Sequence, residues 1–136
     1  MAGEEIRKYL GTYFPRSYAE SFCIFDNVFQ NRVFQETITN KKSLSILSVG
    51  CGTGGDIIGL ITAIEKHFHA ISEINIWAID GNIEALVILE QILDKVKLQS
   101  SKKITFKKNE SVINSISDFN FENPPNSKFD FILSFK

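Results

Sequence analysis

Short apolar runs and stretches of helical period alternate along most of the chain. Four runs have the length of buried strands, and the stretches between the first three repeat apolar residues at the spacing of one helix face. The runs are residues 44–49, 74–79, 104–106 and 129–133, and the helical stretches are residues 55–68 and 85–96. This alternation predicts an α/β fold with a doubly wound parallel sheet. We expect three layers, with helices on both faces of the sheet.

An aromatic stripe precedes the first run. It consists of Tyr18, Phe22, Phe25, Phe29 and Val33. Their intervals of three and four residues put them on one face of a single helix over residues 17–35, and Ser17 with Glu20 has the spacing of a capping box at its start. We expect the stripe to pack on the sheet as core. Residues 1–43 are therefore assigned to a helical cap and residues 44–136 to the α/β domain.

A glycine cluster separates the first strand from the helix that follows it. The segment reads Ile46-Leu47-Ser48-Val49-Gly50-Cys51-Gly52-Thr53-Gly54-Gly55-Asp56. Glycine allows backbone angles with φ > 0 and leaves no side chain between the backbone and a ligand. The unpaired N–H groups at the start of the next helix favour a ligand that carries a carboxylate, a ribose or a phosphate.

This segment resembles motif I of the class I S-adenosylmethionine-dependent methyltransferases, which reads apolar-apolar-Asp/Glu-apolar-Gly-x-Gly-x-Gly. The motif glycines and the residues between them are Gly50, Cys51, Gly52, Thr53 and Gly54. Ser48 stands where the family usually carries an acid that helps to hold the methionine end of the cofactor. The resemblance implies a Rossmann-like methyltransferase fold with S-adenosylmethionine bound at this loop. In that family, segments before motif I often form a lid over the substrate, which is a second role open to the aromatic helix.

Asp80 follows the second strand directly. Ligands of parallel sheets bind at the carboxyl ends of the strands, and an aspartate there can accept hydrogen bonds from both hydroxyls of a ribose. The resemblance implies this ribose contact for Asp80, with Gly81 beside it. The alternative is that Asp80 only caps the next helix, a role for which Asn82 is equally suited.

Later strands supply the remaining candidate site residues. By the family pattern, the residues after the third strand lie near the adenine, and here these are Asn109 and Glu110. The fourth strand and Ser134 after it resemble motif IV, which borders the site of methyl transfer. Three more strands follow in a complete family fold, so we expect the domain to be incomplete after the fourth strand.

The resemblance implies methyl transfer from S-adenosylmethionine to an unidentified acceptor, which could be a small molecule, a protein or RNA. Such transfer is an in-line displacement that depends mainly on holding donor and acceptor together, so no residue is assigned as catalytic. An incomplete domain would leave the outer edge of the fourth strand unpaired. Unpaired edges favour association, so we expect the chain either to form a homodimer through this edge or to hold the edge poorly ordered.

Composition and charge argue against several classes of binding partner and site. The chain has 136 residues, 43% of them hydrophobic, and a net charge of −1, so no global field attracts nucleic acid or a membrane. Cys23 and Cys51 form neither a disulfide framework nor a zinc pattern, and no metal site is expected. No apolar run has the roughly 18 residues of a membrane span and no signal peptide is evident, so a cytoplasmic protein is expected.

Basic residues near the ends of two elements are interpreted as structural. His67 and His69 at the end of the first crossover helix are expected to be solvated rather than metal ligands. Four lysines flank the third strand, namely Lys102, Lys103, Lys107 and Lys108. They could contact RNA, but lysines beside an edge strand more often prevent it from pairing with other chains.

Two other functions stay open. Gly50, Gly52 and Gly55 satisfy the Gly-x-Gly-x-x-Gly pattern of nicotinamide-dependent oxidoreductases. That fingerprint expects an acid about 20 residues further on, whereas Asp80 lies 25 residues after Gly55. The other alternative is a cofactor-binding or assembly module without turnover.

Overall fold

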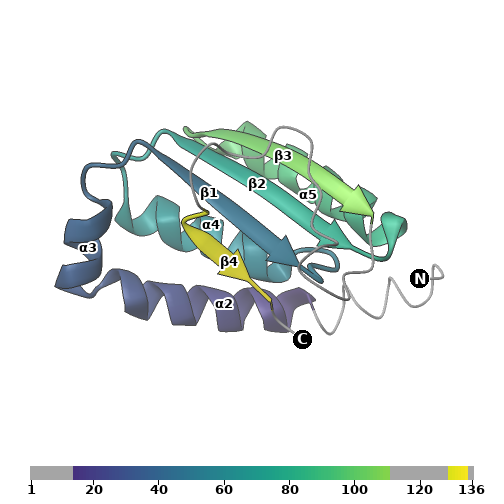
Figure 1. The fold of residues 1–136 in the computed structure, drawn as a ribbon, viewed down its shortest axis with the longest axis horizontal. Coiled ribbons are helices and arrows are strands. Elements are labelled where there is room, and N and C mark those ends of the chain that lie inside the picture. The colour runs from purple at the N-terminus through teal and green to yellow at the C-terminus, as the bar shows by residue number, and fades with distance from the viewer. Residues whose placement is uncertain (1–13, 111–128, 135–136) are drawn as a thin grey trace.

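A computed structural model describes residues 14–110 and 129–134 of the chain. Its elements are α2 (Phe14–Phe29), α3 (Arg32–Ile38), β1 (Ser43–Val49), α4 (Gly55–His67), β2 (Glu73–Asp80), α5 (Ile83–Gln99), β3 (Lys103–Glu110) and β4 (Phe131–Leu133). The strands form one parallel sheet in the order β3-β2-β1-β4 (Figure 1). This confirms the predicted α/β fold with a parallel sheet.

The register of the strands brings their carboxyl ends together. Val49 pairs with Ile79, Asp80 pairs with Glu110, and Leu133 pairs with Ser48. The third strand is longer than the predicted three residues, because its pairing with β2 continues to Glu110. One edge of the sheet therefore collects the loops that follow all four strands.

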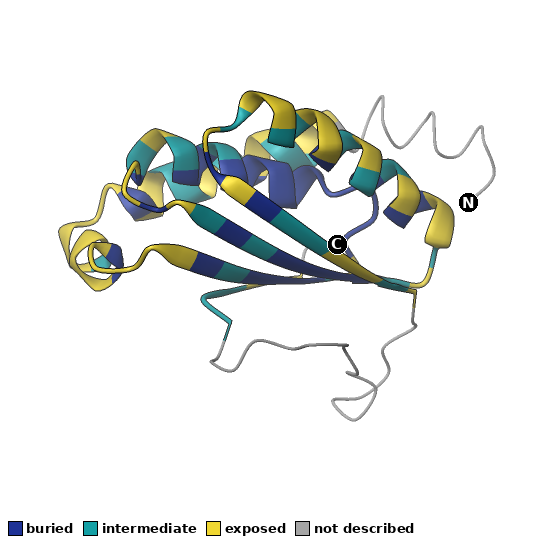
Figure 2. Ribbon diagram, turned by 90° about the horizontal axis from the view of Figure 1, so that it is seen from above, coloured by how far each residue is buried: buried dark blue, intermediate teal, exposed yellow. Residues whose placement is uncertain are grey.

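The helices α2, α4 and α5 cover the same face of the sheet (Figure 2). On the opposite face, Leu47, Trp77 and Ile79 form a small buried cluster with Val49 and Phe129 against it. No helix among residues 14–110 and 129–134 covers this opposite face, so the predicted third layer is not seen in the described part of the chain. It stays a prediction.

The core lies between the sheet and its helices. Alternate residues of the strands, such as Ile46 and Ile76, face apolar residues of α4, such as Ile57 and Leu60, and all four are almost completely buried. Burying each such side chain contributes about 1.5–3 kcal/mol. Phe29 and Ile38 belong to the same cluster, so the N-terminal cap shares one core with the sheet.

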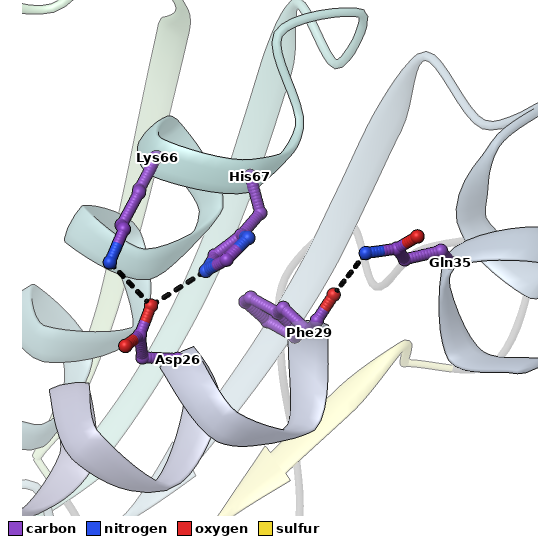
Figure 3. Close-up of polar contacts among 5 residues, drawn as sticks. All are labelled: Asp26, Phe29, Gln35, Lys66 and His67. Atoms are coloured by element: carbon purple, nitrogen blue, oxygen red, sulfur yellow. Dashed lines mark hydrogen bonds and ion pairs between the residues drawn. The ribbon is translucent and has the colours of Figure 1, made fainter. Parts of the chain in front are cut away.

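The predicted single helix over residues 17–35 is wrong, because two helices occupy this region. The side chain of Asn31 caps α3 by accepting a hydrogen bond from the N–H of Phe34 at 3.2 Å. Gln35 then donates from Nε2 to the carbonyl oxygen of Phe29, at the end of α2, at 2.8 Å (Figure 3). These side-chain contacts satisfy backbone groups on both sides of the break, which stabilises it.

Two details of that prediction change with the break. Val33 leaves the stripe and is 72% exposed, whereas Phe22, Phe25 and Phe29 pack on the core as expected. Ser17 lies inside α2 instead of capping it, and its predicted partner Glu20 instead bonds Arg16, one turn earlier, at 3.0 Å.

Helix α2 packs very closely on the first half of α4. A side chain at Gly59 would place its Cβ 2.7 Å from the carbonyl oxygen of Tyr18 and 2.9 Å from the amide nitrogen of Phe22. The hydroxyl of Ser21 donates to the carbonyl oxygen of Asp56 at 2.7 Å. The helix before the sheet therefore fixes the start of α4, where the glycine loop ends.

The outer edge of β4 has no partner strand in the part of the chain that the structure describes. Ile132 of this strand is largely exposed. The homodimer expected through this edge stays a prediction, and light scattering of the chain in solution tests it.

Candidate functional site

The loop between β1 and α4 depends on left-handed glycines. Gly50, Gly52 and Gly54 have φ of 66°, 55° and 83°, angles that other residues adopt only with strain. The N–H of Gly50 donates to the carbonyl oxygen of Ile79 at 2.8 Å, and the N–H of Gly54 donates to that of Cys51 at 2.9 Å. The loop is thereby folded against the end of β2.

Asp80 connects this loop to the next one. Its Oδ2 accepts a hydrogen bond from the N–H of Gly52 at 2.7 Å, and its Oδ1 accepts one from the N–H of Asn82 at 2.9 Å. The N-cap of α5 is Asn82, whose side chain accepts from two N–H groups of the first turn. A carboxylate offers about four acceptor positions. Asp80 is therefore more than a helix cap, and about half of its acceptor capacity is available to a ligand.

The other predicted site residues lie along the same edge of the sheet. Asn109 and Glu110 are the last residues of β3 and pair in register with Ile79 and Asp80. Gly81 directly follows Asp80. Ser134 is exposed and comes one residue after Leu133, which pairs with Ser48. The fold thus brings all ten predicted positions to one edge, while their roles toward a ligand stay predictions.

The glycines of the loop serve different purposes. A side chain at Gly50 would meet no atom within 4 Å, so open space lies beside this part of the backbone. At Gly54 a Cβ would lie only 2.2 Å from Cδ1 of Leu89 in α5. A side chain at Gly54 would therefore force Leu89 to move, whereas Gly50 is the position where a ligand could approach the backbone.

Cys51 and Thr53 are both buried in the loop. Burial raises the pKa of the Cys51 thiol strongly, and the negative charges of Asp80 and Asp56 raise it further. The thiol is therefore protonated at neutral pH, which excludes a thiolate nucleophile. The hydroxyl of Thr53 is completely buried and has no hydrogen-bond partner in the structure described.

Asp56 is a site residue that the sequence prediction missed. It lies in the first turn of α4, is 5% exposed, and its Oδ2 accepts a hydrogen bond from the hydroxyl of Ser48 at 3.4 Å. Burial raises the pKa of Asp56 to about 6, although hydrogen bonds from the backbone of the helix start and from Ser48 oppose this shift. An acid in the first turn of an apolar helix could have indicated this site.

Two predictions for basic residues are wrong. His67 is not solvated, because its Nε2 lies 2.6 Å from Oδ1 of Asp26 in α2, and Lys66 pairs with the same oxygen at 2.9 Å (Figure 3). Lys102 is buried and donates from Nζ to the carbonyl oxygens of Phe68 and Ile71. Both residues hold the end of α4 in place instead of facing solvent.

Neighbouring lysines have other contacts. Lys107 lies over the ring of Trp77 at 6.0 Å, and Lys108 pairs with Glu90 at 3.1 Å.

Among residues 14–110 and 129–134, no group of histidine, cysteine and acidic side chains could hold a metal ion. None of the helices described there is long and apolar enough to cross a membrane.

Comparison with protein-family models finds no match, and comparison with curated proteins also finds none. The functional argument therefore depends on the geometry of this edge and on the sequence resemblance.

Proposed function

We propose that the chain binds S-adenosylmethionine at the carboxyl edge of its sheet and takes part in methyl transfer to an acceptor. The observation that carries the proposal is the Asp80 carboxylate, held at the end of β2 by the N–H groups of Gly52 and Asn82. It lies beside a glycine loop that is open at Gly50. A ribose across this loop would find a fixed acceptor for its hydroxyls.

The charge of the loop favours this ligand over a dinucleotide. Asp80 and Asp56 both act on the thiol of Cys51 and are therefore close to the loop backbone. The N–H of Gly52, which could bind a phosphate, is already donated to Asp80. A pyrophosphate would be repelled by the two carboxylates, whereas the positively charged sulfonium and ammonium groups of S-adenosylmethionine would be attracted.

The protein's contribution to the reaction is binding and orientation. When bound, S-adenosylmethionine supplies an electrophilic methyl group, and the electrons of the broken carbon–sulfur bond remain on sulfur. Asp80 would hold the ribose, and the backbone of the glycine loop would keep the ligand at a fixed position against the edge of the sheet. Orientation alone can supply a large share of the rate in such a displacement, so no acid or base is assigned.

The Asp80→Ala variant tests the proposal. Isothermal calorimetry with S-adenosylhomocysteine should show binding to the unmodified chain and a loss of roughly 1.5–3 kcal/mol in the variant, because a charge-assisted hydrogen-bond pair is removed. The matched control is Asp94→Ala, which removes an exposed acid of α5 whose nearest ion-pair partner is Lys97 at 3.7 Å. Equal affinity of Asp80→Ala and the unmodified chain would contradict the ribose contact.

A methyl-transfer assay distinguishes an active methyltransferase from a cofactor-binding module without turnover. A chain that binds S-adenosylhomocysteine but releases no product from labelled S-adenosylmethionine with small-molecule, protein and RNA acceptors would be a binding module. Binding is common to both outcomes, so the cofactor site is tested independently of the reaction.

A further inference from the structure

The strand β3 forms one border of the sheet (Figure 1). It has eight residues, whereas β4 at the other border has three. The N–H of Lys103 donates toward β2, to the carbonyl oxygen of Ser72, at 2.8 Å. Backbone groups alternate between the two sides of a strand, so those of Ile104, Phe106 and Lys108 point away from β2. No strand among residues 14–110 and 129–134 pairs with this outer side.

Several features that usually protect an edge strand are missing from β3. The strand contains no proline, and its register with β2 is continuous over Lys103–Glu110. Lys107 lies over the ring of Trp77, on the face away from the helices. Lys108 pairs with Glu90 of α5, on the helix face. These lysines therefore lie above and below the sheet, and the edge between them can accept a further strand.

The charges beside this edge favour an acidic partner. Lys103 and Lys107 lie on the same face of β3, and both are exposed. Neither forms an ion pair within the part of the chain described, although Glu73 of β2 is opposite Lys103. Opposite charges on neighbouring strands attract and like charges repel. The other face of the strand presents Phe106, which is half-buried and favours an apolar neighbour.

We propose that the outer edge of β3 binds an extended acidic segment of a partner protein, which adds to the sheet as a further strand. The backbone of this segment pairs with the outward groups of Ile104, Phe106 and Lys108. Its acidic side chains, at alternate positions, face Lys103 and Lys107, and the apolar side chains between them lie on the helix face. This interaction goes beyond the function proposed above, because it needs no cofactor.

The test uses a fluorescein-labelled peptide of eight residues that alternates glutamate and valine. Fluorescence anisotropy measures its binding to the unmodified chain and to the double variant Lys103→Glu/Lys107→Glu, which should bind at least about tenfold more weakly. The matched control, Lys42→Glu/Lys95→Glu, changes the net charge equally at two exposed lysines outside β3. It should stay within about twofold of the unmodified chain. A peptide that alternates lysine and valine should bind at least about tenfold more weakly than the acidic peptide.

Hydrogen exchange locates the peptide on the chain. Without peptide, the outward N–H groups of Ile104, Phe106 and Lys108 should exchange faster than those of Thr105 and Lys107, which face β2. The acidic peptide should slow the outward groups at least about tenfold. Slow exchange of these groups without peptide would overturn the inference, because another part of the chain or a second copy would then cover the edge.

The binding measurements can also overturn the inference. Equal affinity of the acidic and the basic peptide would show that the lysines do not select the partner. Equal affinity of the two double variants would remove Lys103 and Lys107 from the site. Failure of the acidic peptide to bind the unmodified chain would contradict the added strand itself, while the proposed function, which titration with S-adenosylhomocysteine tests, would be unaffected.

Discussion

The two ends of α4 differ in how their charges are matched. At the C-terminal end, Asp26 accepts from both Lys66 and His67 (Figure 3). Lys102 donates to two backbone carbonyls at the same end. At the N-terminal end, Asp56 and Asp80 have only hydroxyl and N–H partners, and no cation of the described residues pairs with them.

This difference separates a structural end from a ligand-binding end. Opposite charges that meet within the fold neutralise each other, and removing one partner destabilises the fold because the other charge is left unpaired. Negative charges that are fixed by dipoles, but not neutralised, keep an attraction for a cationic group from outside. Substitutions at the structural end should therefore affect stability, and substitutions at the other end should affect binding.

The largest loss of stability is expected for Phe29→Ala. Phe29 is completely buried, and its ring centroid lies 4.8 Å from that of Phe68 after α4 and 5.9 Å from that of Phe131 in β4. Removing a buried phenylalanine typically costs about 3–5 kcal/mol. Urea unfolding measures this loss, and Val33→Ala, an exposed position of the same region, is the control. A loss below about 1 kcal/mol would show that the structural end is not the main source of stability.

Lys102→Met should cause the next largest loss. The variant keeps much of the side-chain volume but leaves the carbonyl oxygens of Phe68 and Ile71 without their donor. The expected cost is roughly 1.5–3 kcal/mol by the same unfolding measurement. Lys103→Met alters an exposed neighbour and should stay within about 0.5 kcal/mol of the unmodified chain. Equal effects of the two variants would mean that the buried ammonium contributes no specific stabilisation.

Asp56→Asn should raise stability at neutral pH. The folded pKa of Asp56 is about 6 and its unfolded value is close to 3.9, so its contribution to stability is full below the unfolded value and is lost as pH rises through about 6. At pH 7.5 the variant, which has no charge to bury, should be more stable by on the order of 1–2 kcal/mol. At pH 3.5 this gain should disappear. A variant that is less stable at pH 7.5 would contradict an unpaired buried charge.

Asp26→Asn should show the opposite dependence on pH, with the smallest effect. Hydrogen bonds from His67 and Lys66 hold the pKa of Asp26 below its ordinary value. Its stabilising contribution is therefore present above the unfolded pKa and is lost as pH falls through the folded pKa. The variant should be slightly less stable than the unmodified chain at pH 7, and the difference should shrink as pH falls through the folded pKa of Asp26. The same sign of pH dependence for both acids would remove the distinction between the two ends of α4.

The parallel sheet and the edge that gathers the site could be predicted from the sequence, because local signals specify them. The apolar runs specify the strands, the glycine cluster marks the loop after β1, and Asp80 is placed by its position after β2. The break between α2 and α3 was missed because Val33 continues the aromatic period, while the cap at Asn31 and the contact of Gln35 with Phe29 depend on tertiary geometry.

The contacts at both ends of α4 could not be predicted for a related reason. His67 meets Asp26 from 41 residues away, and Lys102 meets Phe68 from 34 residues away. The role of Asp56 depends on which way the first turn of α4 faces, which is set by the packing of that helix on α2. Patterns within one element do not contain this information.

The most direct test of the central claim is a calorimetric titration of the unmodified chain with S-adenosylmethionine, and separately with NAD, at the same pH and ionic strength. The unmatched carboxylates at the start of α4 predict that the cationic ligand binds and that the dinucleotide, with its pyrophosphate, does not. Binding of NAD without binding of S-adenosylmethionine would contradict the claim.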